Sequence, residues 1–329
     1  MRHIFNNIIS LENLLVAWRE FLCGKKRRQD VLEFSLKFTD HLFSLHHELT
    51  TKTYQHGCYQ SFKINDPKPR EIHKASIRDR LLHHAIYRIL YPYFDKLFIY
   101  DSYSCRNGKG THRAISRFRK FGRKVSLNNT QTCWILKCDI KKFFASIDHQ
   151  ILKNILVRYV EDRDTLWLLA QIIDSFNIKE IVGVGLPLGN LTSQLLANIY
   201  LNELDQFVKR QLKIKYYIRY ADDFVIFHED KNYLQGLTSK ISEFLETKLA
   251  LLLHPEKVFI KTLSSGVDFL GWIHFSHHRV LRTTTKHRMF KHLNRNPMPE
   301  LTASYLGLLS YGSTFNLRGK ICPPSQPPP

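Results

Sequence analysis

Apolar residues recur every three to four positions along several stretches of this chain, which is the period of a helix with one buried face. Residues 9–50 have this pattern and are predicted to form helices that break near Gly24. Another helix is expected to begin at Arg78 and to end at Pro92, because proline lacks the amide hydrogen that a helix interior needs. The same period predicts helices at residues 149–156, 191–207, 233–253 and 301–309.

Other stretches alternate apolar and polar residues or form short apolar runs, and these patterns predict β-strands. A hairpin is expected at residues 59–74, with basic residues at its tip and a turn at Asn65-Asp66-Pro67. Strands are also predicted at residues 133–140 and 258–261, and a last hairpin at 267–275. One further hairpin has strands at residues 216–220 and 224–227, joined by a tight turn that holds Asp222 and Asp223.

The chain is strongly basic. Its 329 residues include 49 Lys and Arg against 29 Asp and Glu, which gives a formal net charge of +20. Solubility needs a charge of magnitude only about 2 to 8 in a small domain. A polyanionic partner explains the excess better, and nucleic acid is the first choice. An anionic membrane surface is the alternative, but we find neither an amphipathic basic helix nor a lipidation motif.

The six cysteines form no CxxC pair and no Cys/His ladder at zinc-finger spacing, so we interpret them as reduced, mostly buried thiols. The N-terminus lacks the features of a secretory signal. No apolar run approaches about 20 residues, the length that a membrane span needs. The expected location is therefore the cytoplasm, with no membrane partner.

Asp222 and Asp223 are adjacent carboxylates flanked on both sides by apolar strand residues. Like charges this close repel each other, and a divalent cation offsets that cost. Hard metals such as Mg²⁺ are bound by one or two carboxylates together with substrate phosphates. Two such metal ions often act together in nucleotidyl transfer. Asp139, at the end of the strand at residues 133–140, is a third candidate ligand. The alternative is a polar turn that happens to be Asp-Asp.

Three other segments have interpretable chemistry. Asp148 precedes a predicted helix, and we interpret it as the N-cap rather than a catalytic group. Residues 182–190 are glycine-rich, which lets a backbone approach a nucleotide closely, and Asn190 or Thr192 is expected to cap the next helix. Residues 101–124 are rich in cations interleaved with Phe118 and Phe121, a combination that suits base stacking and phosphate contact.

Six segments in order resemble a reverse transcriptase over roughly residues 67–317: IRDRLLHHAI, LKCDIKKFFASIDH, LPLGNLTSQLLANIYLNELD, YADD, LHPEKV and FLGW. The resemblance implies an α+β chain with the right-hand polymerase fold of fingers, palm and a short helical thumb. It divides the chain into an N-terminal extension with fingers, a palm with an inserted fingers segment, a basic thumb and a disordered proline-rich tail. The corresponding residues are 1–132, 133–278 with the insertion at about 150–185, 279–320 and 321–329.

Position by position, the resemblance makes Asp139, Asp222 and Asp223 the catalytic carboxylates that bind two Mg²⁺ ions, with Mn²⁺ as a substitute. Asp139 and Asp222 are expected to bridge both ions. Phe144 matches the ring that excludes a ribose 2′-hydroxyl, whereas Phe143 is expected in the core.

The resemblance also implies nucleotide and nucleic-acid contacts. The remaining nucleotide-binding candidates are Arg70, Arg78, Leu188, Gly189, Gln194 and Lys257. Nucleic acid is expected to contact Arg106, Lys109, Arg113, Arg119, Arg123, Gly271, Arg282, Lys286 and Arg288. Leu188 stands where many reverse transcriptases have a glutamine. We hypothesise low fidelity, because an apolar residue cannot hydrogen-bond near the incoming nucleotide.

Within the family, the strings GLPLGNLTSQ and SYLGLLSYGSTFNL resemble the enzymes of diversity-generating retroelements. This implies an error-prone RNA-directed DNA polymerase that copies a template-repeat RNA into cDNA for mutagenic retrohoming. Its expected partners are the template RNA, a cDNA or RNA primer, dNTPs and a ring of a small basic accessory variability protein. The alternatives are a reverse transcriptase of a group II intron, a retron or an antiphage defence system, and a non-catalytic RNA-binding protein on the same fold.

Overall fold

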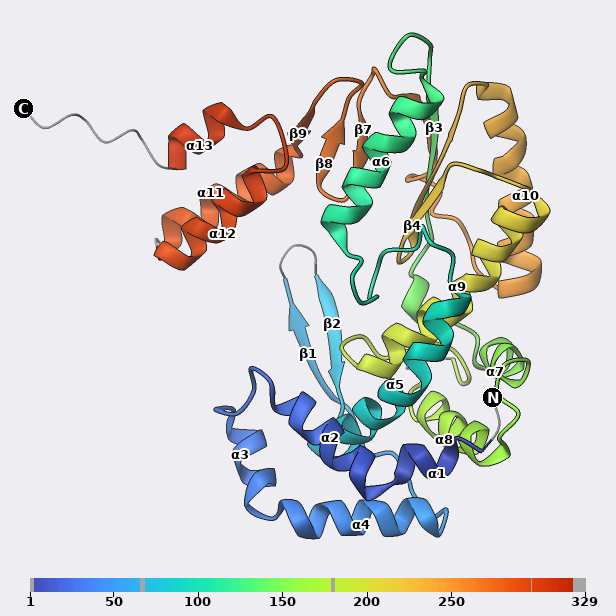
Figure 1. The fold of residues 1–329 in the computed structure, drawn as a ribbon, viewed down its shortest axis with the longest axis vertical. Coiled ribbons are helices and arrows are strands. Elements are labelled where there is room, and N and C mark those ends of the chain that lie inside the picture. Colours follow the sequence, from blue (N-terminus) through green and yellow to red (C-terminus); the bar gives the residue numbers. More distant parts are fainter. Residues whose placement is uncertain (1–2, 66–68, 179–180, 297, 322–329) are drawn as a thin grey trace, which may run out of the picture. The chain divides into compact units, whose positions relative to one another are not determined.

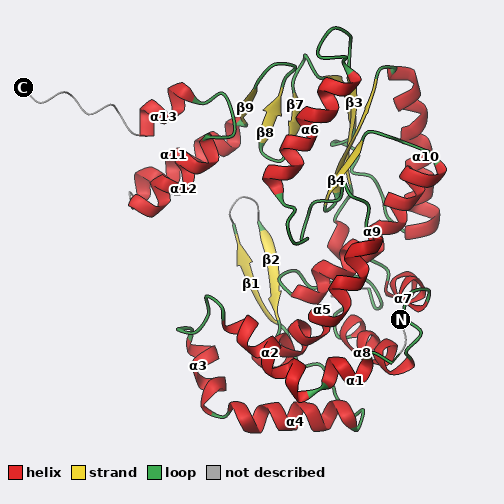
Figure 2. Cartoon of the chain, in the orientation of Figure 1, coloured by secondary structure: helices red, strands yellow, loops and turns green. Residues whose placement is uncertain are grey.

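The computed structural model describes residues 3–65, 69–178, 181–296 and 298–321. The predicted hairpin turn therefore lies largely outside the described residues, as does all but the first residue of the predicted proline-rich tail. The chain forms two compact units, whose elements are drawn in Figures 1 and 2. Unit 1 comprises Met1–Tyr100, Ile140–Lys213 and Ser242–Leu253, and unit 2 comprises Asp101–Asp139, Ile214–Ile241 and His254–Pro329. The division into fingers, palm and thumb stays a prediction.

Unit 1 consists mainly of helices. They are α1 (Phe5–Ile9), α2 (Leu11–Leu22), α3 (Gln29–Leu36), α4 (Phe38–Thr50), α5 (Ile77–Leu97), α7 (His149–Val157), α8 (Arg163–Asp174), α9 (Leu191–Gln206) and the π-helical turn η2 (Phe207–Gln211). The unit also contains the C-terminal part of α10 (Lys231–Leu249), the 3-10 turn η1 (Phe143–Ala145) and a hairpin of β1 (Gln60–Ile64) and β2 (Arg70–Lys74).

Helix α5 passes through Pro92, so the predicted end at this residue is wrong. Proline costs a helix one hydrogen bond, but Leu90 and Phe94 on either side of it are buried and hold the helix in the core. The cap prediction at Asp148 is confirmed, because its Oδ1 accepts a hydrogen bond from the Ile151 amide at 2.8 Å. Local signals thus set the start of α7, whereas packing overrides the local signal in α5.

Unit 2 contains two antiparallel sheets, one of four strands in the order β4-β5-β3-β6 and one of three in the order β7-β8-β9. The strands are β3 (Trp134–Asp139), β4 (Tyr217–Tyr220), β5 (Asp223–His228), β6 (Phe259–Thr262), β7 (Val267–Phe269), β8 (Trp272–His274) and β9 (Arg279–Leu281). Strand β9 was not predicted. The helices are the N-terminal part of α10 together with α6 (Thr111–Val125), α11 (Thr283–Arg295), α12 (Pro299–Leu309) and α13 (Phe315–Ile321).

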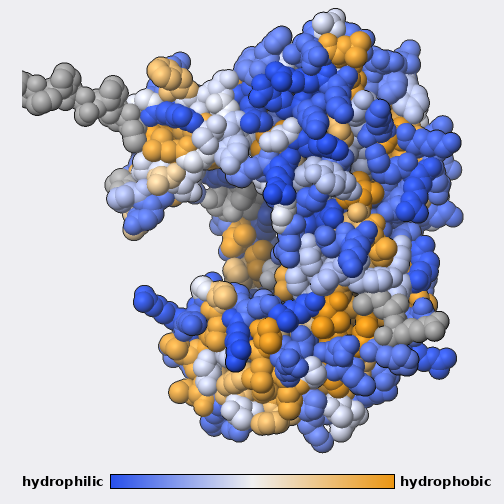
Figure 3. Space-filling model, viewed as in Figure 1, coloured by the Kyte–Doolittle hydropathy of each residue, from blue (hydrophilic) through white to orange (hydrophobic). Residues whose placement is uncertain are grey.

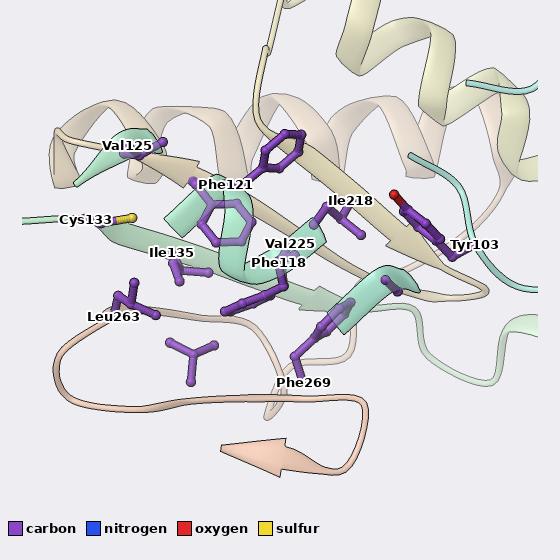
Figure 4. Packing of buried hydrophobic residues seen from close by; sticks show 13 residues of the cluster. Tyr103, Phe118, Phe121, Val125, Cys133, Ile135, Ile218, Val225, Leu263 and Phe269 are labelled. Carbon is purple, nitrogen blue, oxygen red and sulfur yellow. The ribbon is translucent and has the colours of Figure 1, made fainter. Parts of the chain in front are cut away.

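The apolar face of α6 forms part of the core of unit 2. Phe118, Phe121 and Val125 are buried in one cluster with Ile135 of β3 (Figure 4). The ring centroids of Phe118 and Phe227 are 4.8 Å apart, in an edge-to-face arrangement. The prediction that Phe118 and Phe121 stack on bases is therefore wrong. Helix α6 is also an amphipathic basic helix that the sequence interpretation overlooked, and the core covers its apolar face.

The surface differs between regions of the molecule. In Figure 3 the visible face around α6 is largely hydrophilic, whereas apolar atoms gather over the helices of unit 1. The exposed apolar side chains of α3 and α4 include Leu32, Leu36 and Phe43. Within the described ranges, no helix is long and apolar enough to cross a membrane.

All five cysteines that the structure describes are free thiols, as predicted. Cys133 and Cys138 are buried, but Cys23, Cys58 and Cys105 are exposed, so the expectation of mostly buried thiols is wrong. The two buried thiols lie on and just before the central strand β3, where an apolar neighbourhood raises the pKa of Cys138 and keeps it protonated.

Candidate active site

Asp139 and Asp223 lie directly opposite each other in the last register pair of the β3–β5 ladder. Opposite residues on antiparallel strands project to the same face of a sheet. The hairpin itself differs from the prediction, because β5 begins at Asp223, which pairs with Tyr220. Ala221 and Asp222 therefore form the two-residue turn, and the placement of Asp223 in the turn is wrong.

A buried arginine supports this turn. Ala221 has a φ of 54°, in the left-handed region that costs a non-glycine residue about 1–2 kcal/mol. The side chain of Arg219, which is fully buried, donates from Nη1 to the Ala221 carbonyl at 3.2 Å. The Arg219 amide donates to the Asp101 carbonyl at 3.0 Å. Arg219 thus fixes the turn that carries Asp222, and its position inside an apolar strand was the one signal in the sequence.

Lys137 is a second residue that was not predicted. It precedes Asp139 by two positions on β3, is 8% exposed, and its Nζ lies 3.4 Å from Asp223 Oδ2. The other oxygen of that carboxylate, Asp223 Oδ1, is buried and has no hydrogen-bond partner among the described residues. Burial raises the pKa of Asp223 to about 7, and the charge of Lys137 opposes this rise.

Lys257 contacts the other carboxylate. Its Nζ donates to Asp139 Oδ1 at 2.9 Å. The turn that positions it is tied to β3, because the His254 amide donates to the Asp139 carbonyl at 2.8 Å and the Lys257 amide donates to His254. The predicted phosphate contact is thus a carboxylate contact in this structure. Lysine charges compensate both Asp139 and Asp223.

The chemistry of these residues fits a divalent cation. Three carboxylates supply the oxygen ligands that Mg²⁺ prefers, and Asp223 Oδ1 is a buried acceptor without a donor. In the part of the chain that the structure describes, no three His, Cys, Asp or Glu side chains stand close enough together to hold a metal. To share one ion with the spare Oδ1 of Asp223, Asp139 would have to turn away from Lys257.

A second set of predicted residues, which are nucleotide-binding candidates, lies in unit 1 around the segment that contains Leu188. The Leu186 amide donates to the Phe144 carbonyl at 2.7 Å, and the His73 amide donates to the Leu188 carbonyl at 2.9 Å. This segment is therefore tied to η1 on one side and to β2 on the other. Phe143 is 3% exposed, and Phe144 is half-buried.

The residues after Leu188 are held by β2 and the residues that follow it. Gly189 has a φ of 107°, and a Cβ there would lie 2.8 Å from Ile72 Cγ2, so both the turn and the close approach require glycine. Asn190 stands at the N-cap of α9 but makes no cap bond. The predicted N-cap position is therefore confirmed, but the Asn190 Nδ2 donates to the His73 carbonyl at 2.8 Å and the side chain does not cap the helix. Gln194 lies in the first turn of α9 and is partly exposed.

The two arginines predicted to contact phosphates differ in their surroundings. Arg70 is exposed at the start of β2. Arg78, in the first turn of α5, donates from Nη2 to Glu48 Oε2 at 2.6 Å and to the Gln55 carbonyl at 3.1 Å. A cation at the start of a helix is unfavourable because the helix dipole is positive there, and the Glu48 carboxylate compensates the charge of Arg78.

All nine residues predicted to contact nucleic acid lie in unit 2. They occupy the loop before α6, α6 itself, the β7–β8 turn and the residues from β9 into α11. Arg282 donates from Nε to Asp268 Oδ1 at 2.8 Å, so its charge is compensated. Gly271 has a φ of 86°, and a Cβ there would meet only Thr285 Oγ1 at 3.7 Å. The turn, rather than a close approach within the chain, requires this glycine.

The mixed helices and antiparallel sheets are consistent with a right-hand polymerase fold. Residues 63–274 match the family described as reverse transcriptase (RNA-dependent DNA polymerase). The chain belongs to the reverse transcriptase family, and the predicted family resemblance is confirmed.

Curated relatives are distant. Protein YkfC of Escherichia coli K12 is 25% identical over 256 residues, which cover 67% of this chain and 65% of the relative. The group II intron-encoded protein LtrA of Lactococcus lactis is 25% identical over 279 residues, which cover 64% of this chain and 45% of LtrA. The chain thus spans less than two thirds of either relative.

Solved structures support the fold. Telomerase from Candida albicans in complex with a TWJ fragment of telomeric RNA has a TM-score of 0.52 at 12% identity, covering 71% of this chain and 46% of that chain. Apo telomerase from Candida tropicalis, truncated from its C-terminal domain, has a TM-score of 0.50 at 14% identity, covering 68% of this chain and 54% of that chain. At these identities the similarity shows the fold alone.

Proposed function

We propose that this protein is an RNA-directed DNA polymerase that copies an RNA template into cDNA. The observation that supports this most is the pairing of Asp139 with Asp223 beside the turn residue Asp222. Carboxylates at one sheet end are suited to nucleotidyl transfer, and reverse transcriptases generally use divalent metal ions.

In this proposal Asp139, Asp222 and Asp223 hold two Mg²⁺ ions. When bound, the ions supply charge that lowers the pKa of the primer 3′-hydroxyl and that neutralises the triphosphate and the departing pyrophosphate. Arg219 keeps the turn rigid, so that Asp222 needs little reorganisation. Lys257 has a 40% exposed side chain, and once it leaves Asp139 its ammonium is available to a phosphate.

The residues of unit 1 select the nucleotide. The ring of Phe144 rejects a ribose 2′-hydroxyl by its bulk, and its backbone bond to Leu186 positions it. Leu188 and Gly189 line the nascent base pair through a segment that β2 holds in place. Because the side chain of Leu188 offers no hydrogen bond, discrimination at this position rests on shape, which is weaker than discrimination by polar groups.

The template-repeat RNA of a diversity-generating retroelement is the substrate we propose, with a ring of a small basic accessory protein as partner. The string from Gly185 to Gln194 and the apolar Leu188 support this class. A group II intron reverse transcriptase is the second candidate, which the similarity to LtrA favours.

Two experiments test these proposals. Purified protein with Mg²⁺, an RNA template, a primer and dNTPs should make cDNA; RNA binding without synthesis would instead support a non-catalytic RNA-binding protein. For the retroelement class, Leu188→Gln should lower misincorporation opposite template adenine, whereas Leu188→Met should not. Equal error rates in the wild type and Leu188→Gln would contradict the low-fidelity hypothesis.

A further inference from the structure

A hollow of about 290 Å³ lies within unit 2, apart from the catalytic carboxylates. Helix α6, the β8–β9 turn and the loop between α12 and α13 form its walls. Its polar lining is basic or neutral, and none of the described residues that line it is acidic; the main polar side chains are Arg119, His277, His278, Arg279, Ser310 and Ser313.

The two arginines concentrate positive charge at this hollow. Arg279 donates from Nε to the Tyr311 carbonyl, while its Nη1 is buried and has no hydrogen-bond partner among the described residues. Burial lowers the pKa of Arg279, and the nearby charge of Arg119 lowers it further. Arg119 is exposed on α6. An anion between these two guanidinium groups would relieve their repulsion.

The loop that closes the hollow is held in one position. A Cβ at Gly312 would lie 2.1 Å from Trp272 Cζ3, so the loop backbone rests directly on the buried indole ring. The Ser313 amide donates to the Arg279 carbonyl at 2.9 Å, which joins the loop to β9. The hollow is therefore preorganised, and a ligand does not have to order it first.

Tyr311 also lines a second, more open hollow of about 550 Å³. The Tyr311 ring stacks on His112, with centroids 3.8 Å apart and planes 17° from parallel, and Tyr311 is 37% exposed. An exposed aromatic ring that a stacked neighbour holds flat is suited to a nucleic-acid base. The two hollows share Ser310 and Tyr311 and are open, which suits a passing strand better than an enclosed small molecule.

We propose that this surface is a nucleic-acid subsite, which binds a backbone phosphate of a single strand at Arg119 and Arg279 and stacks the neighbouring base on Tyr311. The proposal rests on the proposed function, because a polymerase that copies RNA has a strand to hold outside its catalytic site. It assigns a position and an orientation to one nucleotide, rather than a general attraction to a basic surface.

The test measures the affinity of a short fluorescein-labelled single-stranded RNA by anisotropy, between about 50 and 200 mM salt. EDTA is present and dNTPs are absent, so the result does not depend on polymerase activity. Arg119→Gln should weaken binding and reduce the salt slope by about 0.7, the value for one phosphate contact on a single strand. Lys120→Gln changes the next exposed cation of α6, which does not line the hollow, and should leave the slope unchanged.

The stacking contact has its own variants. Tyr311→Leu should weaken RNA binding about tenfold, the order expected for one base–aromatic stack, and Tyr311→Phe should bind like the wild type. Because one nucleotide joins both contacts, the losses in Arg119→Gln and Tyr311→Leu should not add in the double variant.

Three results would overturn the proposal: an unchanged slope in Arg119→Gln, equal effects of Arg119→Gln and Lys120→Gln, or wild-type affinity in Tyr311→Leu. A protein that makes no cDNA but shows the expected slopes would refute the proposed function and leave this subsite in place. The reverse pattern would refute only the subsite.

Discussion

Lys137 Nζ lies 3.4 Å from Asp223 Oδ2, across neighbouring strands of one sheet. Lys137 is 8% exposed, so its contact with the Asp223 carboxylate is shielded from water. Asp223 Oδ1 remains without a hydrogen-bond donor among the described residues. The pair is therefore incomplete by itself, and the spare acceptor is available to a cation.

Removal of the Lys137 charge should destabilise the sheet. Lys137→Met keeps the apolar stem but leaves a buried carboxylate without its cation, and we expect the free energy of unfolding to fall by about 1.5–3 kcal/mol. Adding Asp223→Asn should restore part of this loss, because a neutral amide needs no counter-charge. Urea unfolding of the wild type, both single variants and the double variant at about pH 8 measures the coupling. Additive effects would show that the two side chains do not interact.

His274 should make unit 2 sensitive to acid. Its side chain is 3% exposed, and its Nε2 lies 3.2 Å from the Phe269 carbonyl. Burial lowers the pKa of His274 to about 3, and the charge of Arg279 contributes. In the unfolded chain His274 has the ordinary pKa of about 6.5. Between about pH 3 and 6.5 the imidazole therefore binds a proton in the unfolded chain but stays neutral in the folded protein.

The sign follows from this difference in proton binding. His274 has no effect on stability above about pH 6.5, and it lowers the free energy of unfolding as the pH falls from about 6.5 towards about 3. The expected slope is up to about 1.4 kcal/mol per pH unit. His274→Gln should remove it, whereas the same change at the exposed His278 should not. Chemical unfolding across this pH range decides the matter, and equal slopes in all three proteins would contradict the assignment.

Two glycines near the C-terminus should respond oppositely to alanine. Gly312→Ala forces a methyl group into the Trp272 ring and should destabilise the protein by about 1–3 kcal/mol. Gly307→Ala, on an open face of α12, meets no atom within 4 Å and should stabilise by about 0.5–1 kcal/mol. Thermal unfolding compares them, and a Gly312→Ala protein as stable as the wild type would mean that the loop does not rest on the indole ring.

A smaller side chain at Phe144 should relax sugar selection. Phe144→Val opens space for a 2′-hydroxyl, so ribonucleotide incorporation should rise by at least about tenfold relative to dNTP incorporation. Primer extension with each nucleotide type gives the ratio. An unchanged ratio would mean that Phe144 is only a packing residue, like the neighbouring Phe143.

The sequence predicted those parts of the site that local pattern determines. Asp139 at the end of an apolar run and the Asp-Asp turn both carry a local signal, since strands and tight turns have their own composition. Lys137 and Arg219 were missed because strand register, which decides the carboxylate or carbonyl that each one meets, is a non-local property.

Errors in the fold have similar causes. Phe118 and Phe121 alternate with cations, a pattern that fits base stacking and a core-facing helix equally, and only the sheet beneath α6 distinguishes the two. Pro92 is a strong local stop signal, but tertiary packing around α5 outweighs the lost hydrogen bond. Strand β9 opens a segment that is dense in Arg, Lys and His, which hides the strand pattern, and only its pairing with β8 marks it as a strand.

Primer extension by an Asp222 variant is the most direct test of the proposed polymerase activity. With an RNA template, a DNA primer, dNTPs and Mg²⁺, we expect the wild type to synthesise cDNA and EDTA to stop it. Asp222→Asn should lower the rate by more than about 100-fold, beyond the loss typical of residues that only support a metal ligand, with RNA affinity unchanged. Asp148→Asn, which keeps the helix cap of α7, should extend the primer like the wild type. Extension by Asp222→Asn at the wild-type rate would contradict a polymerase site at this turn.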